Sequence, residues 1–489
     1  MEKPMDIYLH VISPIHIGCD DVYEPTAFVV DELRKKLISF DPMDFIKSLS
    51  LEDRDRFTNL CMEGTVGSLI GIYKFMAGRK INGAEVDVAS DFISHYRDVK
   101  ALPMKDEKKI NQELNRFIIA RTIFNPQTNA PYIPGSSLKG ALRTAYLSKL
   151  AKDQGIRYFW EKQMKDSATL REEKIYEIIG RKRMAHVLEE SLLKLLKGTF
   201  ETDPFRMVKI SDFLPFSNVK TKIVYAVNRK KKVSKHEARG PFQILEILQN
   251  GTTFRGTLAV QRPHEKAGIR EPITFEKLWK ALRDFYQPAF EGESKLLEEI
   301  GVDGGSVTDA IRRVFPNGFG EKALLVRLGR HSGAEAVTIE GNRYIRIMQA
   351  KGKPPKFESS ATTLWLAAES RKPTSNRALL PFGWAILSSE PIILPDNVHE
   401  KKEAPEMRTT QPETKAQTMQ STTLDRFISE IRKIDPMDAG RIGTTIDRAL
   451  KELISEEDRK KFAVAVRDHM GAAFKKSKAK QKLQNILGE

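Results

Sequence analysis

A strand-turn-helix pattern over residues 131–147, PYIPGSSLKGALRTAYL, constrains the fold more than any other part of the chain. A short apolar stretch ends in a Pro-Gly turn, and Gly135 lets the backbone turn tightly and approach a ligand closely. We expect Ser136 or Ser137 to cap the helix that follows, which leaves N–H groups and the positive end of the helix dipole facing outward. Such a helix start attracts phosphate.

One face of this predicted helix carries positive charge. Lys139, Arg143 and Tyr146 follow one another at helical spacing. The opposite face is apolar and consists of Leu138, Ala141, Leu142 and Ala145. A lysine, an arginine and an aromatic ring suit a sugar-phosphate backbone, and the alternative is a capped helix with a solvated basic face. A Walker A loop is excluded, because Lys139 precedes Gly140 and the Gly-x4-Gly-Lys-Ser/Thr spacing is absent.

The overall composition favours a basic intracellular protein. The chain has 489 residues, enough for two or three domains with their own cores. Its net charge of +16 makes nucleic acid the first partner to consider. Two cysteines, Cys19 and Cys61, argue against a disulfide scaffold or a multi-cysteine zinc site and fit a reducing cytoplasm. No apolar run approaches the roughly 20 residues of a membrane-spanning helix, so we expect no membrane partner.

The order of patterns predicts an α+β protein of tandem ferredoxin-like (RRM-like) domains with helical insertions and a C-terminal helical appendix. The first domain would cover residues 1–200 and the second 201–395. Residues 396–423 read as a linker, because Glu, Lys, Pro, Thr and Gln replace large apolar residues there. Residues 424–489 read as a small helical module, because apolar residues recur at helical intervals.

A second glycine-rich segment, residues 324–333, again combines an apolar stretch with a glycine turn and basic side chains. Arg327, Arg330 and the loop from His331 through Gly333, which includes Ser332, are candidates to bind phosphate without reading sequence. Tyr132, Phe124 and Tyr146 are candidates to stack on an exposed base, and packing in the core is the alternative for each ring. Between the two segments, Asn250-Gly251 separates two β-rich runs and predicts a type I′ hairpin.

The string IPGSSLKGALRTA at 133–145 resembles the glycine-rich loop and helix of the RAMP superfamily, the RNA-binding subunits of CRISPR effector complexes. Residues 13–26, SPIHIGCDDVYEPT, are similar to the N-terminal Pro-x-His-Ile-Gly element of that family. Residues 327–338 resemble its second glycine-rich segment, and the stretches 362–367 and 380–387 resemble its closing strands.

In combination, these segments look most like the end-capping subunit of the type III-A (Csm) complex. The resemblance implies tandem RAMP domains that hold the 3′ side of the guide RNA, cytoplasmic antiviral defence, no established active site and no cofactor. The implied partners are CRISPR RNA and the backbone and small subunits of the complex. The RNA-binding residues implied are Gly135, Ser136, Ser137, Lys139, Gly140, Arg143, His16, Arg327, Arg330, His331 and Ser332.

Three basic or amphipathic stretches complete this interpretation. The run 229–239 is expected to be an arm that contacts RNA or a neighbouring protein. The tail 475–482 is either a solvated helix end or a phosphate or protein contact. The stretch 174–196 is expected to be an amphipathic helix.

Two other functions stay open. An endoribonuclease that processes the guide or cleaves the target needs a base for the 2′-hydroxyl, or carboxylates that hold metal. Its candidates are His16, Asp20 and Asp21, for which packing and a solvated loop are the alternatives. Cys-x-x-Cys, His-Glu-x-x-His and calcium-loop motifs are absent, so no metal site is expected. The remaining hypothesis is a scaffold whose helical appendix docks a maturation nuclease.

Overall fold

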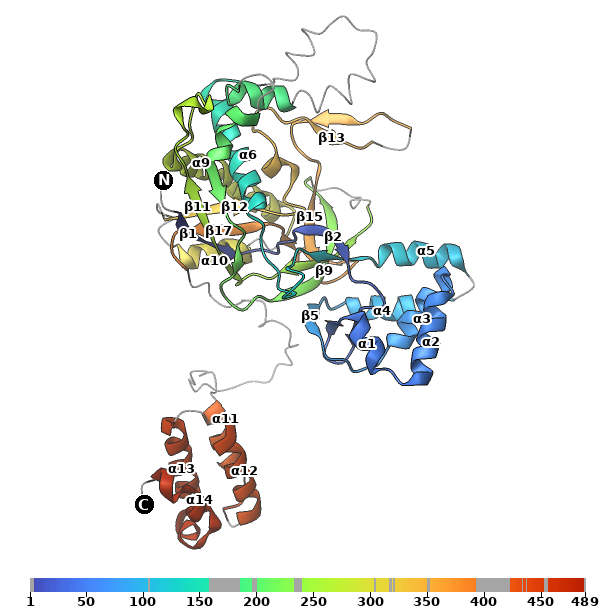
Figure 1. Ribbon diagram of the computed structural model, residues 1–489, viewed down its shortest axis with the longest axis vertical. Helices are drawn as coiled ribbons and strands as arrows, with labels where there is room; N and C mark the ends of the chain where they lie inside the picture. The colour runs from blue at the N-terminus through green and yellow to red at the C-terminus, as the bar shows by residue number, and fades with distance from the viewer. Residues whose placement is uncertain are drawn as a thin grey trace, which may run out of the picture. The chain divides into compact units, whose positions relative to one another are not determined.

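The computed structural model describes residues 4–103, 106–157, 185–195, 200–232, 240–302, 305–315, 319, 322–349, 352–392, 423–432, 434–436, 438–452 and 456–487. The chain divides into two compact units, Met1–Lys402 and Glu403–Glu489 (Figure 1). Most of the predicted linker, residues 233–239 of the basic run and most of the stretch 174–196 lie outside the described ranges.

One sheet of the first unit has the strand order of a ferredoxin-like domain. Its strands are β1 (Met5–Val11), β7 (Val208–Ile210), β8 (Leu214–Pro215), β11 (Thr253–Val260), β12 (Ala323–Arg327) and β17 (Trp384–Ser388). The order is β12-β17-β1-β11-β7, β8 also pairs with β11, and neighbours are antiparallel. Helix α6 (Gly135–Asp153) lies in sequence between β1 and β7, and α9 (Phe275–Glu299) between β11 and β17. This is the β-α-β-β-α-β arrangement, with β12 as an additional edge strand.

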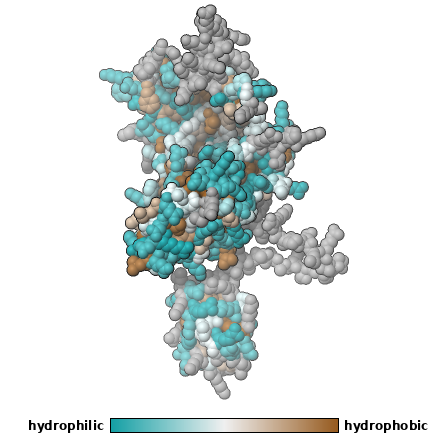
Figure 2. Space-filling model, turned by 90° about the vertical axis from the view of Figure 1, so that its right-hand side faces the viewer, coloured by the Kyte–Doolittle hydropathy of each residue, from teal (hydrophilic) through white to brown (hydrophobic). Residues whose placement is uncertain are grey.

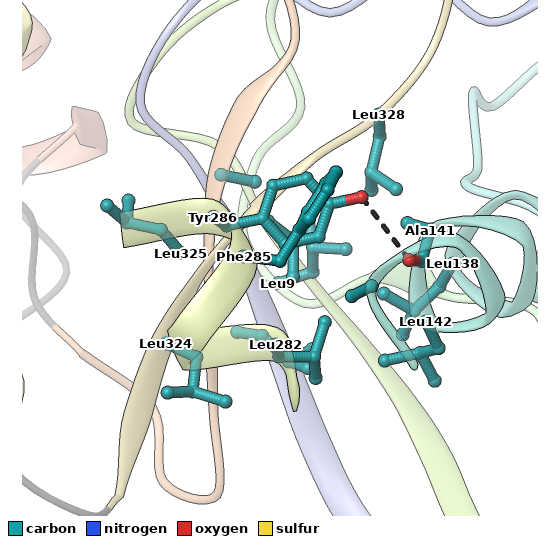
Figure 3. Close-up of a cluster of buried hydrophobic side chains, with 14 of the residues drawn as sticks. Leu9, Leu138, Ala141, Leu142, Leu282, Phe285, Tyr286, Leu324, Leu325 and Leu328 are labelled. Carbon is teal, nitrogen blue, oxygen red and sulfur yellow. Dashed lines mark hydrogen bonds between the residues drawn. The ribbon is translucent and has the colours of Figure 1, made fainter. Parts of the chain in front are cut away.

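Helices α6 and α9 lie side by side over one face of this sheet (Figure 1). Leu9 of β1, Leu142 of α6 and Leu282 of α9 are fully buried in the shared core (Figure 3). The Tyr286 hydroxyl of α9 donates a hydrogen bond to the Ala141 carbonyl of α6 over 3.3 Å, which satisfies a buried polar group. Each large apolar side chain buried here contributes about 1.5–3 kcal/mol.

A second, larger sheet continues the first unit. Its strands are β2 (Gly18–Val22), β3 (Phe28–Asp31), β4 (Lys36–Ser39), β5 (Ala84–Val88), β6 (Ile119–Thr122), β9 (Thr221–Lys230), β10 (Gln243–Leu248), β15 (Thr363–Ala368) and β16 (Leu380–Pro381). The order is β2-β6-β10-β9-β5-β4-β3, and β15 pairs with β9 and β16. The described residues also include α10 (Gly305–Val314) and a separate hairpin of β13 (Ile345–Ile347) and β14 (Lys356–Glu358).

A helical insertion lies beside β3, β4 and β5 (Figure 1). It consists of α1 (Pro42–Ser48), α2 (Leu51–Met62), α3 (Val66–Met76), α4 (Phe92–Lys100) and α5 (Glu107–Arg116). The side chains of Asp41, Ser50 and Thr65 cap the first three helices by accepting backbone N–H groups, as their residue types favour.

On the face drawn in Figure 2, hydrophilic side chains predominate and hydrophobic ones are scattered. Such scattered apolar residues do not form a docking surface.

The α+β class is confirmed. Each sheet takes strands from both sides of residue 200, since β1 pairs with β11 and β17, and β6 pairs with β10. The two sheets therefore do not separate into residues 1–200 and 201–395. The prediction of a type I′ hairpin at Asn250-Gly251 is wrong, because β10 and β11 belong to different sheets. The Gly251 N–H instead donates to the Val11 carbonyl over 3.0 Å.

The second unit is a helical module with its own core. Its helices are α11 (Thr423–Arg432), α12 (Ala439–Glu452), α13 (Glu456–Met470) and α14 (Lys478–Leu487). Phe427, Ile446 and Phe462 are fully buried in it. In the basic tail, Lys482 pairs with Asp447 over 2.5 Å. Nowhere in the described ranges is a helix both long and apolar enough to cross a membrane.

Candidate nucleic-acid interface

The start of α6 is packed against the edge of the ferredoxin-like sheet. A Cβ atom at Gly135 would lie 2.6 Å from the Ser211 carbonyl oxygen, so the close approach requires glycine. The Gly135 N–H donates to Asp212 Oδ1 over 2.8 Å, and no side chain of the preceding Pro134 caps the helix. The predicted cap by Ser136 or Ser137 is therefore wrong. The carboxylate of Asp212 accepts the hydrogen bond from the first N–H group of α6, where a phosphate had been expected.

Lys139 lies between two cavities in the first turns of α6. The first, called the sheet-side pocket, has a volume of about 490 Å³ and is lined by Pro4, Gly135, Ser136, Lys139, Val208, Lys209, Ile210, Ser211, Thr257 and Ala259. The second, called the helix-side pocket, has a volume of about 570 Å³ and is lined by Lys139, Gly140, Arg143, His186, Glu189, Glu190, Leu195, Phe200, Asp203 and Phe205. Lys139 thus borders both hollows from a single position.

The charge of Lys139 is not neutralised by an ion pair with any residue that the structure describes. Burial lowers the pKa of Lys139, the nearby charges of Lys209 and Arg143 lower it further, and Asp203 opposes them. Two ammonium groups held near one another gain from an anion between them. The geometry at Lys139 is thus compatible with the predicted phosphate contact, and Lys209 lines the same pocket.

Arg143 faces carboxylates of its own chain. Its guanidinium pairs with Glu189 and Asp203, both over 2.8 Å. It also lies 5.1 Å from the centre of the Phe205 ring. Tyr146, expected beside it as a stacking surface, is 5% exposed and packs edge-on against Phe205. Of the three side chains predicted to face RNA together, only Lys139 remains open to a ligand.

We expect Arg143→Ala to lower the free energy of unfolding by about 2 kcal/mol, because it leaves the Asp203 carboxylate buried without its partner. Urea unfolding followed by circular dichroism measures the change. Lys152→Ala is the matched control, since Lys152 is an exposed cation in the last turn of the same helix. Equal stability of the two variants would contradict a structural role for Arg143.

The second glycine-rich segment lies against the segment that contains His16. The Arg330 N–H donates to the His16 carbonyl over 2.8 Å, and a Cβ atom at Gly329, where φ is +79°, would lie 2.4 Å from the same oxygen. His331 has φ 64°, its Nε2 lies 3.0 Å from Gln243 Oε1, and its ring lies 4.7 Å from that of Trp365. The structure therefore brings His16, Arg330 and His331 together at one junction.

Most of this junction is packed rather than open. His16 is fully buried, and its Nδ1 donates to the Glu246 carbonyl over 2.7 Å. Burial lowers the pKa of His16, and burial together with the charge of Arg330 lowers the pKa of His331 to about 3. Both rings are therefore neutral near pH 7 and offer no charge to phosphate. Ser332 is buried, and its hydroxyl donates to the Leu328 carbonyl. Only the side chain of Arg330 is exposed.

Arg327 also points inward. Its guanidinium pairs with Glu293 over 2.8 Å, with side-chain exposures of 8% and 13%. Its Nε donates to the Phe382 carbonyl over 2.9 Å, and the group lies 4.9 Å from the Trp384 ring. These contacts make Arg327 part of the core between α9 and β12.

Asp20 and Asp21 lie on the edge strand β2, where the pairing with β6 shifts register. Asp20 has φ 61°, and Asp21 accepts the backbone N–H of Val22 over 2.9 Å. Both side chains are exposed, on a strand rather than in the solvated loop that was the alternative. Among the described residues, His, Cys, Asp and Glu side chains form no group of three or more that could hold a metal ion.

The fold is similar to that of a chain in a solved structure. No curated protein matches the chain. A chain in the cryo-EM structure of a Csm–crRNA–target RNA ternary complex of a type III-A CRISPR-Cas system is 17% identical, with a TM-score of 0.50, covering 79% of this chain and 100% of that one. The crystal structure of Csm5 from T. onnurineus is 16% identical, with a TM-score of 0.43, covering 78% and 99%. The sequence pattern of the RAMP superfamily matches residues 8–306, more than half of the chain, which therefore belongs to that superfamily.

Proposed function

We propose that this chain is a non-catalytic RNA-binding subunit that caps the backbone of a type III-A CRISPR effector complex at the 3′ side of the guide RNA, in cytoplasmic antiviral defence. Membership in the RAMP superfamily supports an RNA-binding role. The similar fold of a chain from a complex with crRNA and target RNA supports the choice of complex. The partners in this proposal are CRISPR RNA and the backbone and small subunits.

The RNA-binding part of this proposal rests on one observation. Lys139, which forms no ion pair with the described residues, lies beside Lys209 at the sheet-side pocket. Ser136 and Gly140 are exposed on the same helix start and leave room for a backbone to approach. Phosphate contacts of this kind position a strand without reading its sequence. That suits a guide whose sequence varies.

The competing function is an endoribonuclease. A general base must come within about 2.6–3.2 Å of the proton it removes. His16 is fully buried and hydrogen-bonded to the Glu246 carbonyl, so it does not meet that requirement in this conformation. Asp20 and Asp21 are exposed and remain the residues to test.

We expect Lys139→Ala with Lys209→Ala to weaken binding of a single-stranded RNA to the full chain and to flatten its salt dependence. Each lost phosphate contact should reduce the slope of log K against log salt by about 0.7. Fluorescence anisotropy at several salt concentrations measures both quantities. Lys152→Ala, on the same helix but away from both pockets, should change neither. An unchanged slope in the double variant would refute this interface.

Incubation of the full chain with repeat-containing RNA separates binding from cleavage. We expect bound and uncut RNA. Cutting that disappears in Asp21→Asn would replace the non-catalytic proposal with the enzymatic one. Purification of the complex with and without residues 403–489 tests the scaffold hypothesis, because a maturation nuclease docked on the helical module would be lost on deletion.

A further inference from the structure

The ferredoxin-like sheet has a second face, opposite to α6 and α9. Side chains alternate along a strand, and Ile7 and Leu9 of β1 point into the helix-covered core. Tyr8 therefore points to the other side. Its partner across β11 is Arg255, and the partner of Arg255 on β8 is Leu214. Residues directly opposite one another share a face, so these three side chains form one row.

This row is open to solvent. Leu214 is 58% exposed, Arg255 is exposed and Tyr8 is half-buried. By contrast, Leu325 and Ile386, which pair on β12 and β17, are 3% and 0% exposed. On β1 and β11 the neighbouring pair on this face, His10 and Thr253, is also buried, so among the described residues the open part is the row of Tyr8, Arg255 and Leu214.

An aromatic pair stands on the open part. The rings of Tyr8 and Phe216 lie 5.0 Å apart at 73°, edge to face. Phe216 is 49% exposed, so much of its ring is free for another planar group. Its position is fixed, because the N–H groups of Phe216 and Ser217 donate to the Thr253 carbonyl over 2.9 and 3.2 Å, and the Thr253 N–H donates to Ser217 Oγ over 2.9 Å.

The same face leads to the sheet-side pocket. Asp6 is opposite Thr257, and Lys209 is opposite Ala259, both on β11. Ala259 lies four residues from the row of Tyr8, or about 13 Å along the strand. Thr257, Ala259 and Lys209 line the sheet-side pocket together with Lys139. The aromatic pair and the two lysines therefore belong to one continuous surface.

The charges on this surface indicate which class of ligand it can bind. Asp6 is already neutralised by Arg255 over 2.7 Å. Lys139 and Lys209 have no ion pair with the described residues, so the surface carries unpaired positive charge next to exposed aromatic rings. Single-stranded nucleic acid combines the complementary features, a chain of negative charges and a series of planar bases. A mainly apolar protein partner would not use the two ammonium groups.

We propose that the open face of the ferredoxin-like sheet binds single-stranded RNA, with a base stacked on the Tyr8–Phe216 pair and phosphates of the adjoining nucleotides at Lys209 and Lys139. This inference rests on the RNA-binding function proposed above and adds to it a base-stacking site. Because every base has a flat face, such a site tolerates any sequence.

Two substitutions at one position test stacking against simple apolarity. Phe216→Leu keeps an apolar side chain without a ring, and Phe216→Trp keeps the ring. The probe is an oligouridylate with a single 2-aminopurine, mixed with the intact chain, and its fluorescence falls when the base stacks. We expect Phe216→Leu to weaken binding at least about five-fold and to abolish the quenching, whereas Phe216→Trp retains both. The salt slope should not change in either variant, because no charge is removed.

The outcomes separate this site from the general function. Equal affinity and quenching for Phe216→Leu and wild type would overturn the stacking site while leaving the RNA-binding proposal to its own lysine test. If Phe216→Leu bound RNA normally but failed to assemble with the backbone subunits, the face would be a protein-docking surface and the proposal would fall. A wild-type chain that binds RNA without quenching the probe at any of several 2-aminopurine positions would also overturn it.

Discussion

Replacing Arg327 with alanine is expected to lower the free energy of unfolding of the first unit by about 3–5 kcal/mol. The substitution leaves the Glu293 carboxylate, 13% exposed, without the guanidinium that lies 2.8 Å away. It also removes the hydrogen bond to the Phe382 carbonyl and the contact with the Trp384 ring. A buried carboxylate without its counter-ion costs far more than the net stability that the intact pair contributes.

Urea unfolding measures this loss, and Arg330→Ala is the matched control. Arg330 is three residues away and its side chain is exposed, so its removal should change stability by no more than about 0.5 kcal/mol. Arg327→Ala with Glu293→Gln should recover part of the loss, since the amide still accepts the Trp384 Nε1 hydrogen bond. If Arg327→Ala were as stable as wild type but bound RNA weakly, Arg327 would be a phosphate ligand after all.

The sequence was most informative where structure depends on near neighbours. Aspartate is a favoured cap at a helix start, and the Asp41 carboxylate accepts the N–H groups of Met43 and Asp44. The apolar runs 27–31 and 36–40, separated by a short polar turn, are typical of a hairpin, and Phe28 pairs with Ser39. Both features depend on residues within about ten positions of one another, so a local pattern contains their cause.

Such local patterns do not predict which strands pair when they are far apart in the sequence. The Asn-Gly pair at 250–251 favours a hairpin locally, but β10 finds partners in β6 and β9, and β11 in β1 and β7. All residues of β10 after Gln243 are buried, so the strand gains most in the middle of a sheet. Tertiary burial thus outweighed the turn preference.

The candidate site shows the same limit. From the sequence, Lys139 and Arg143, one helical turn apart, were equally good candidates to contact phosphate. Arg143 meets Asp203, 60 residues away, whereas Lys139 meets no carboxylate among the described residues. Asp212, 77 residues from Gly135, takes the helix N–H predicted for phosphate. No local spacing indicates which cation is neutralised at long range.

Tyr8 and Phe216 had not been proposed as stacking residues. The signal for Tyr8 was present in the alternation of β1, where it falls between Ile7 and Leu9 on the face away from the core. Phe216 could not be found in this way, because it lies beyond the short strand β8 and its position depends on Thr253.

Gly329→Ala is expected to destabilise the first unit by about 3 kcal/mol. The residue has φ +79°, where any other side chain costs about 1–2 kcal/mol. A Cβ atom there would also lie 2.4 Å from the His16 carbonyl oxygen. That oxygen accepts the Arg330 N–H over 2.8 Å, so it cannot move away without breaking a hydrogen bond. Crowding of this kind adds about 1–3 kcal/mol.

Gly251→Ala separates the two contributions to this loss. Gly251 also has positive φ, +85°, but a Cβ atom there meets nothing within 4 Å. It should therefore cost only the conformational part, about 1–2 kcal/mol by urea unfolding. The difference between the two variants measures how tightly the second glycine-rich segment is held against His16. Equal losses would mean that the two segments separate readily, and His16 would then be free to reach a ligand.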